Sequence, residues 1–306
     1  MSPQSAHAGF LQGVKTYYDR NTPRFVSSHQ SAVAKAIHRE VWGQGVQTEK
    51  EAFEYVNELV FTEIEKLREK FLAPLRILDL GSGVGGTLFY LARRMPVRAL
   101  GITLSPVGVR LAEDLARAAS LDGVCRFVEG NYLDLPKLES QHAVYAIESF
   151  LHGPDAAKFF RSAASVLETD GLLMVCDDFL TEEGEQPRDH KAVRDLADFK
   201  RGWHVGSLIT TGQAGLHASA AGLRLVEDRD LTPHLKLNRP CDRLIAAFVN
   251  LGRGLPFRSP WWDSWVGGHA IQRCLLTGLI RYRLLVFEKM RPGKKPPAQN
   301  SCWRSA

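Results

Sequence analysis

The sequence predicts an α/β fold with a parallel sheet covered by helices on both faces. Three observations support this class. Short apolar runs alternate with helical stretches of about 10 to 15 residues, which is the pattern of βαβ units. The first of these runs ends in a cluster of glycines, as a buried strand does at a tight turn. The composition, with 44% hydrophobic and 24% charged residues, is that of an ordinary globular protein.

The predicted elements follow in chain order. The clearest helix covers residues 48–71, where Thr48 and Glu51 form a capping box and apolar residues recur at steps of three and four. We expect strands at residues 76–80, 98–104, 125–130, 143–147, 172–176, 222–228 and 281–290. We expect helices at residues 87–94, 109–119 and 154–167, and a turn at residues 169–171.

The length indicates a catalytic core with additional elements, since 306 residues exceed the usual size of a single domain. We expect a helical cap or lid at residues 1–72. The core would occupy residues 73–290, with cap insertions at about 181–212 and 232–278. Residues 291–306 contain Pro, Lys and Ser without periodicity, which predicts a flexible tail.

The composition also restricts the class and location of the protein. The five cysteines are scattered without a Cys-x-x-Cys pair, and no histidines cluster at metal-ligand spacing, so we expect reduced thiols, a cytoplasmic protein and no metal site. No signal-peptide pattern and no apolar run of the ~18 residues that a spanning helix needs are present, so we expect no transmembrane segment. The formal charge of +5 is dispersed, so no nucleic-acid partner is expected. The sequence does not decide whether the protein forms a homo-oligomer.

The strongest functional motif is LDLGSGVGG, which ends the first core strand and carries Asp79. Glycines at a strand-to-helix turn let a ligand approach the backbone, and the following helix offers unpaired N–H groups. Taken alone the motif is ambiguous, because Gly81, Gly83 and Gly86 also satisfy the dinucleotide fingerprint G-x-G-x-x-G.

Three features favour a cationic nucleoside over a dinucleotide. Asp79 precedes the glycines, and its charge suits a cationic amino-acid group better than a pyrophosphate. Thr103 stands where a nicotinamide enzyme should carry an acidic residue that binds the ribose. Asn131 lies just beyond the third strand, from where its amide could pair with an adenine edge. A nicotinamide oxidoreductase and a close-packed turn without a ligand are therefore the weaker interpretations.

In this order and spacing, the segments LDLGSGVGG, GITLSPV, EGNYLDLP and AIESFLH resemble class I S-adenosylmethionine (SAM)-dependent methyltransferases over about residues 75–180. GITLSP is especially similar to the branch that contains tocopherol, sterol and cyclopropane-type lipid enzymes and the prenyl-diphosphate C-methyltransferases. The resemblance implies a Rossmann-like sheet of seven strands, mostly parallel with the last strand antiparallel. It also implies that SAM is held at the carboxyl ends of the first four strands.

The resemblance further implies which residues bind SAM. The methionine part would be contacted by Gly81 and Gly83, the ribose and adenine by Thr103 and Leu104, and the adenine by Asn131 and Tyr132. Tyr18 in YYDR is similar to the tyrosine of a tyrosine–aspartate pair by which related lipid enzymes close their amino-terminal segment over SAM. The chain departs from related sequences at Gly108, where they often have Gln, so a side-chain contact to the ribose would be missing or replaced.

Methyl transfer is a direct displacement, so the enzyme mainly aligns the acceptor, excludes water and removes any proton released. Glu148 and His152 are the acid–base candidates, because AIES leaves the fourth strand at the crevice where α/β folds hold substrates. If the acceptor is an alkene carbon, methylation generates a carbocation and Glu148 would take the proton. The alternative is that Glu148 fixes a loop or SAM, and that His152 caps the next helix.

Aromatic residues in the flanking segments are candidates for a lid over the acceptor. Trp42, Trp203 and His204 are the candidates for substrate contact, together with His38, and packing without substrate contact is the alternative. The segment PWWDSW (residues 260–265) is either a pocket wall or an apolar contact surface for a membrane or another subunit. The basic residues of the later insertions are expected on solvated helix faces rather than at a diphosphate site.

The sequence therefore predicts a SAM-dependent methyltransferase of a small molecule. Its most specific version is the C-methylation of an isoprenoid or similar lipid-like substrate in specialised metabolism. One alternative is an O- or N-methyltransferase of a secondary metabolite, with His152, His204 or His38 as the base. Another is a non-catalytic SAM-binding partner subunit that docks through residues 260–265.

Overall fold

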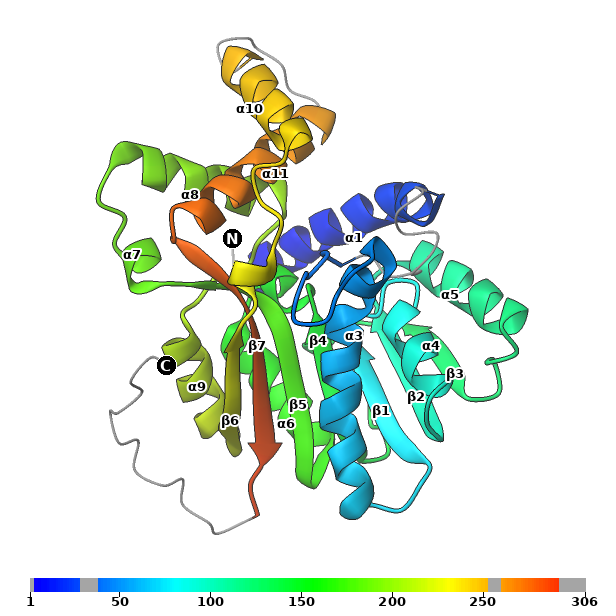
Figure 1. The fold of residues 1–306 in the computed structure, drawn as a ribbon. Helices are drawn as coiled ribbons and strands as arrows, with labels where there is room; N and C mark the ends of the chain where they lie inside the picture. Colours follow the sequence, from blue (N-terminus) through cyan, green and yellow to red (C-terminus); the bar gives the residue numbers. More distant parts are fainter. Residues whose placement is uncertain (1–2, 28–37, 253–259, 292–306) are drawn as a thin grey trace.

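The computed structural model describes residues 3–27, 38–252 and 260–291. Its centre is a seven-stranded sheet with the strand order β3-β2-β1-β4-β5-β7-β6 (Figure 1). The strands are β1 (Leu75–Leu80), β2 (Val97–Thr103), β3 (Cys125–Glu129), β4 (Gln141–Ile147), β5 (Leu167–Leu180), β6 (Leu223–Asp230) and β7 (Ile280–Lys289). The first five strands are parallel to one another, and β7 is antiparallel to both β5 and β6. This confirms the predicted fold class, including the antiparallel last strand.

Helices cover both faces of the sheet, because its central strands are buried on both sides (Figure 1). On one face, α3 (Glu49–Lys66), α4 (Gly86–Ala92) and α5 (Pro106–Ala118) contribute to one apolar core cluster. On the other face, α6 (Ala156–Val166) and α9 (Thr211–Ala220) contribute to a second cluster. The sheet therefore separates two apolar cores.

Most of the remaining helices gather at the edge of the sheet where β1 to β5 end (Figure 1). They are α1 (Pro3–Ser27), α7 (Glu182–Glu185), α8 (His190–Gly202), α10 (Pro240–Gly252), α11 (Pro260–Leu276), and the short 3-10 helices η2 (Phe150–His152) and η3 (Thr232–His234), while η1 (Leu67–Glu69) extends α3. None of the helices in the described ranges has both the length and the apolarity that crossing a bilayer requires. The domain boundaries stay a prediction, and most of the expected tail lies outside the described residues.

The structure moves the bounds of two elements by four residues or more, and it places the turn expected at residues 169–171 within β5. The helix expected at residues 48–71 keeps its capping box between Thr48 and Glu51 but ends at Lys66, where the 3-10 turn follows. The strand expected at residues 172–176 starts at Leu167 and runs to Leu180. The expected strand is too short because Asp177 and Asp178 interrupt the apolar run, although the structure buries both residues and pairs them with β7.

An aromatic cluster in the apolar core on the α6 face of the sheet provides a test of the packing. Phe160 is fully buried, and its ring contacts Phe150, Phe159 and Phe287, which joins η2, α6 and β7. We expect Phe160→Ala to lower the free energy of unfolding by about 3–5 kcal/mol, because it removes these contacts and leaves a cavity. Denaturant unfolding followed by circular dichroism measures the change. Leu216→Ala, at a side chain that is 64% exposed, is the control, and an equal effect of both substitutions would contradict the packing.

Candidate active site

The candidate site lies at the carboxyl ends of β1 and β4, two neighbouring strands from which the chain departs to opposite sides of the sheet. Directly after β1, the N–H groups of Gly81 and Ser82 donate to the Ile102 carbonyl at 2.8 and 3.0 Å. Directly after β4, the Ser149 hydroxyl donates to the Leu80 carbonyl. Gly81 has a φ of +103°, and a Cβ there would lie 2.3 Å from the Ser149 Cβ, so glycine is required at this position.

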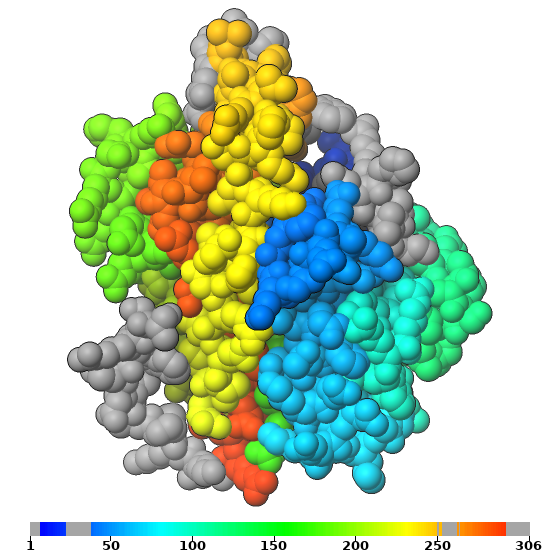
Figure 2. All heavy atoms as spheres, in the orientation of Figure 1, coloured from blue at the N-terminus to red at the C-terminus, as the bar shows by residue number. Residues whose placement is uncertain are grey.

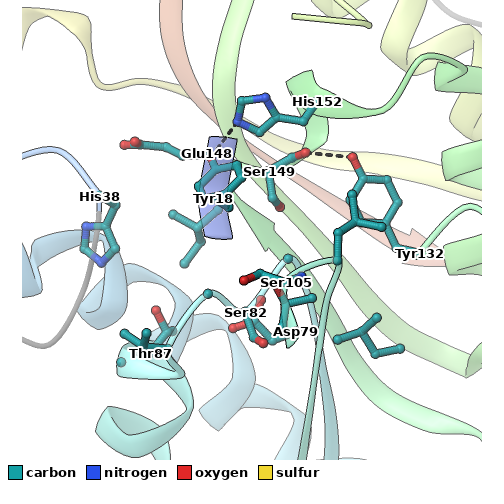
Figure 3. Close-up of a pocket in the computed structure, with 18 of the residues that line it drawn as sticks. Tyr18, His38, Asp79, Ser82, Thr87, Ser105, Tyr132, Glu148, Ser149 and His152 are labelled. Atoms are coloured by element: carbon teal, nitrogen blue, oxygen red, sulfur yellow. Dashed lines mark hydrogen bonds between the residues drawn. The ribbon is translucent and has the colours of Figure 1, made fainter. Parts of the chain in front are cut away.

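A cleft of about 930 Å³, its open mouth included, occupies this edge (Figure 3). Ten candidate site residues of the sequence analysis line the cleft: Tyr18, His38, Asp79, Gly81, Gly83, Thr103, Leu104, Tyr132, Glu148 and His152. The topology brings them together from α1, from the segment before α3, from the ends of β1 and β2, and from the loops that follow β1, β2, β3 and β4.

Asp79 places a buried acid at the floor of the cleft. Its side chain is nearly inaccessible, and burial raises its pKa to about 8, while the neighbouring Tyr145 hydroxyl acts in the opposite direction. The carboxyl is therefore largely protonated at neutral pH. A cation bound beside it would favour the ionised form, so this part of the cleft suits a positively charged ligand.

Two buried polar atoms beside the cleft have no hydrogen-bond partner among the described residues. His38 Nε2 lies 3.1 Å from the Asn57 Oδ1, and because this oxygen can only accept, the ring carries its proton on Nε2. The His38 Nδ1 is then a buried acceptor without a partner, and the Ser82 hydroxyl is also unpaired. Both residues line the cleft (Figure 3). Since buried polar atoms are normally satisfied, these two atoms indicate where polar groups of a ligand would bind.

The buried His152 and the half-buried Tyr18 form a hydrogen-bonded pair at the cleft (Figure 3). The His152 Nδ1 lies 3.1 Å from the His204 carbonyl, which can only accept, so Nδ1 carries the proton. The Nε2 atom then accepts from the Tyr18 hydroxyl at 2.8 Å. Burial lowers the pKa of His152, and the His204 carbonyl only partly offsets this. The imidazole is therefore neutral near pH 7 and has the protonation state that a base requires.

The helix α1 is attached on both sides of the cleft. Tyr18 bonds to His152, which follows β4, and the next residue, Asp19, accepts from the hydroxyl of Ser105. Ser105 is the N-cap of α5 and follows β2. The two contacts hold α1 across the cleft, in the position of a lid.

Glu148 is held at the cleft in an unusual backbone conformation. Its φ of +48° lies in the left-handed region that non-glycine residues rarely adopt. The Glu148 N–H donates to the Cys176 carbonyl at 2.8 Å, and its Oε1 accepts from the Arg39 N–H and the Tyr282 hydroxyl, each at 2.9 Å. Contacts from three separate segments thus hold the backbone and orient the carboxylate.

Arg39, whose N–H binds Glu148, also neutralises the buried Asp178 with its side chain. The Arg39 guanidinium forms a two-pronged ion pair with Asp178, in which Nη1 donates to Oδ1 at 2.7 Å, and it lies 4.7 Å from the centre of the Tyr282 ring. Burial raises the pKa of Asp178, and Arg39 opposes the rise. The sequence patterns did not predict a role for Arg39, Asp178 or Tyr282. The available signal was the Asp177–Asp178 pair at the end of an apolar run, where charge is unexpected.

Four residues selected from the sequence do not line this cleft: Asn131, Trp42, Trp203 and His204. The Asn131 side chain accepts from the Leu133 N–H at 2.9 Å and so supports the turn after β3. Trp42 donates from its ring to Glu40. His204 contributes its carbonyl to His152. Gly108, where related sequences often have Gln, is buried, and a Cβ there would approach the Gly83 carbonyl to 3.2 Å.

Trp203 instead lines a second cavity, of about 1120 Å³ with its open mouth included. This cavity lies beside α10 and α11, and Trp265 of the segment 260–265 also lines it. Arg39 faces this second cavity, whereas the preceding His38 faces the first cleft. The segment around residues 38–39 therefore separates the two cavities. No cluster of three or more side chains that could ligate a metal occurs in the described parts of the chain.

Fold and site together define an α/β protein with a ligand cleft at the switch point of its sheet, built from a glycine loop, a buried acid and a neutral histidine. Residues 77–171 match the family model of the methyltransferase domain. This match confirms the resemblance to methyltransferases. The matched segment contains both the glycine loop after β1 and the residues that follow β4.

Curated relatives agree with the family match. Cycloartenol-C-24-methyltransferase 1 of Oryza sativa subsp. japonica is 27% identical over 175 residues, which cover 54% of this chain and 50% of the relative. The chloroplastic tocopherol O-methyltransferase of Arabidopsis thaliana is 37% identical over 101 residues, or 33% of this chain and 29% of the relative. The chain thus matches half of these relatives' length or less.

A solved structure extends the likeness to nearly the whole chain. Geranyl diphosphate C-methyltransferase from Streptomyces coelicolor A3(2) has a TM-score of 0.66 at 15% identity, and the superposition covers 92% of this chain and 98% of that one. At this level of identity, the likeness establishes the shared fold.

Arg39 provides a test of how the cap segment is bound. We expect Arg39→Met to lower the free energy of unfolding by about 3–5 kcal/mol, because it leaves Asp178 buried without a countercharge. Adding Asp178→Asn should recover part of the loss, since the buried acid is then gone. Thermal unfolding measures both variants, and Arg98→Met, at an exposed arginine, is the control. Equal destabilisation of the single and double variants would contradict the electrostatic explanation.

Proposed function

We propose that this protein is a SAM-dependent methyltransferase of a small molecule. The observation that carries the proposal is the cleft that combines the glycine loop after β1 with the buried Asp79, within the segment that matches the methyltransferase domain. SAM contains a sulfonium and an ammonium group, and the floor of the cleft suits a cation. When bound, SAM supplies an electrophilic methyl group.

The residues of the cleft fit SAM in chemistry. We propose that Asp79, Gly81 and Gly83 hold its amino-acid part, and that Thr103, Leu104 and Tyr132 hold the nucleoside, with Tyr18 closing the site. The unpartnered His38 Nδ1 can accept a hydrogen bond, and the Ser82 hydroxyl can donate one. Asn131 would act from the turn that follows β3 rather than from the wall of the cleft.

For the acceptor, we propose a carbon of an isoprenoid or similar lipid-like molecule, with Glu148 as the base. The Glu148 carboxylate lies at the cleft, and the rings of Tyr18 and Tyr132 line it. Methylation of an alkene carbon leaves a carbocation, which aromatic faces stabilise, and a carboxylate then restores a double bond by taking a proton. The sterol relative, whose name specifies methylation at carbon, supports this choice.

A second candidate is methylation of an oxygen or nitrogen atom with His152 as the base. The neutral state of its ring and the position of its proton on Nδ1 favour this role, because Nε2 can take a proton through the Tyr18 hydroxyl. The tocopherol relative is named as an O-methyltransferase. In this case Tyr18 would connect the acceptor to the base.

The decisive experiment incubates the purified protein with methyl-labelled SAM and a panel of prenyl diphosphates, quinones and phenols, followed by mass spectrometry. Label on carbon supports the first acceptor, and label on oxygen or nitrogen supports the second. SAM binding without transfer to any acceptor would instead support a non-catalytic SAM-binding subunit. Calorimetry without heat from SAM or its demethylated product would overturn the proposed function.

The pKa of Asp79 gives a pH dependence for SAM binding. Burial raises this pKa to about 8, so below that pH a proton must leave before the carboxylate can pair with a cation. We expect SAM affinity to rise from about pH 6 to pH 8, by up to about tenfold per pH unit. Isothermal titration calorimetry measures the slope. Asp79→Asn should bind SAM more weakly and without this slope, whereas the exposed Asp122→Asn should keep it. A slope of the opposite sign would exclude the role of Asp79.

Two substitutions separate the base candidates. Glu148→Gln preserves the shape of the side chain and an acceptor oxygen for Tyr282, so it removes mainly the ability to take a proton. If the acceptor is carbon, we expect Glu148→Gln to lower the single-turnover rate by about 10²–10⁴-fold with SAM binding unchanged. If the acceptor is oxygen or nitrogen, His152→Asn should cause the larger loss. Glu139→Gln, at an exposed position, is the control, and full turnover of both variants with SAM bound would exclude both bases.

A further inference from the structure

The helix α10 turns an apolar face to solvent. With α11 it projects from the edge of the molecule, above the ends of the strands (Figures 1 and 2). Leu244, Phe248 and Leu251 recur at steps of four and three, and are 74%, 51% and 85% exposed. The opposite face, with the buried Val249, is the one turned inward. A surface helix normally turns its polar face to water, so this arrangement is the reverse of the usual one.

The apolar surface continues onto the neighbouring helix. Trp265 of α11 is 42% exposed, and its ring centre lies 5.1 Å from that of Phe248. We define the apolar patch as Leu244, Ile245, Phe248, Leu251 and Trp265. Ile245 and Trp265 also line the second cavity, so the patch is continuous with the wall of that cavity.

The sequence around the apolar patch carries more basic than acidic residues. Residues 236–265, which include the whole patch, contain five basic and two acidic residues, in a chain whose formal charge is +5. In the described part, Lys236 lies over the Trp42 ring, and the exposed Arg243 donates to the Asn238 side chain. Arg239 makes ion pairs with Glu40 and Asp242. Basic residues beside exposed leucine, phenylalanine and tryptophan are typical of helices that lie in the interface of a bilayer.

The charge favours a lipid surface over a second copy of the chain. A symmetric dimer through α10 would bring the same basic residues against each other, which opposes association. Anionic headgroups instead attract them, and each basic residue near such a surface contributes to binding. At 13 residues the helix is too short to cross a bilayer, but it can lie in the interface with its apolar face inserted.

We propose that the apolar patch on α10 and α11 docks this protein on the surface of an anionic lipid bilayer. Docking in this orientation brings the second cavity, which shares Ile245 and Trp265 with the patch, next to the lipid. The proposal does not depend on the methyltransferase activity, because it rests on the exposed side chains and the charge around them.

Vesicle co-sedimentation tests the proposal with the full chain. We expect the protein to bind vesicles of mixed phosphatidylglycerol and phosphatidylcholine, and to bind vesicles of phosphatidylcholine alone much more weakly. Raised salt should also weaken binding, because the attraction is partly between charges. The triple variant Leu244→Ser, Phe248→Ser, Leu251→Ser should lose about tenfold or more in partitioning, since the inserted apolar area is lost.

A matched triple variant controls for a general effect of removing exposed apolar side chains. It carries Leu72→Ser, Val193→Ser and Leu216→Ser, at positions that are also exposed. This variant should bind vesicles like the unchanged chain, and both variants should keep the thermal unfolding midpoint. Equal loss in both triple variants, or no vesicle binding by the unchanged chain, would overturn the proposal. Analytical ultracentrifugation without lipid tests the alternative that the patch binds a second copy of the chain. The patch would be a dimer interface if the unchanged chain is dimeric, if only the α10 triple variant is monomeric, and if the unchanged chain does not bind vesicles.

Discussion

The ion pair between Arg39 and the buried Asp178 is the constraint on which the site depends. The strand β5 continues past its apolar run, and so carries Asp177 and Asp178 into the interior. Burying a carboxylate is costly unless a countercharge lies beside it. Arg39 supplies that charge from the segment that precedes α3, and its backbone N–H binds Glu148. Arg39 therefore stabilises the buried Asp178, binds the segment before α3 to the sheet, and orients the Glu148 carboxylate at the cleft.

Burial shifts the pKa values of two ionisable groups of the cleft, Asp79 and His152, in opposite directions. It disfavours charge, so it raises the pKa of the acid and lowers the pKa of the imidazole. Both groups are therefore largely neutral near pH 7 in the free cleft. A cationic ligand changes this balance at Asp79, whereas His152 keeps its lone pair on Nε2, held by the Tyr18 hydroxyl. Burial thus makes Asp79 a group that a cation would ionise, and it keeps His152 in the neutral form that can take a proton.

The two cavities share one partition, formed by the segment around His38 and Arg39. On one side lies the cleft with the glycine loop, and on the other the cavity whose wall continues into the apolar patch. Tyr18 and Asp19 of α1 close the first side through separate contacts. An apolar molecule that enters beside α10 would thus meet the partition near Glu148. This arrangement connects the proposed lipid-like acceptor with the proposed lipid surface, although each rests on its own observations.

The sequence by itself determined the α/β class, the succession of strands and helices along the core, the glycine loop and about half of the residues that line the cleft. These follow from local patterns: periodicity shows which residues are buried, and the carboxyl ends of parallel strands meet at one edge. The tertiary structure decided the contacts of Tyr18 with His152 and of Arg39 with Asp178, which join residues 134 and 139 positions apart. It also decided that the apolar residues of α10 face solvent, and that Trp203 belongs to a second cavity. A local pattern shows that a side chain is apolar or charged, but only the packing of distant segments decides what covers it.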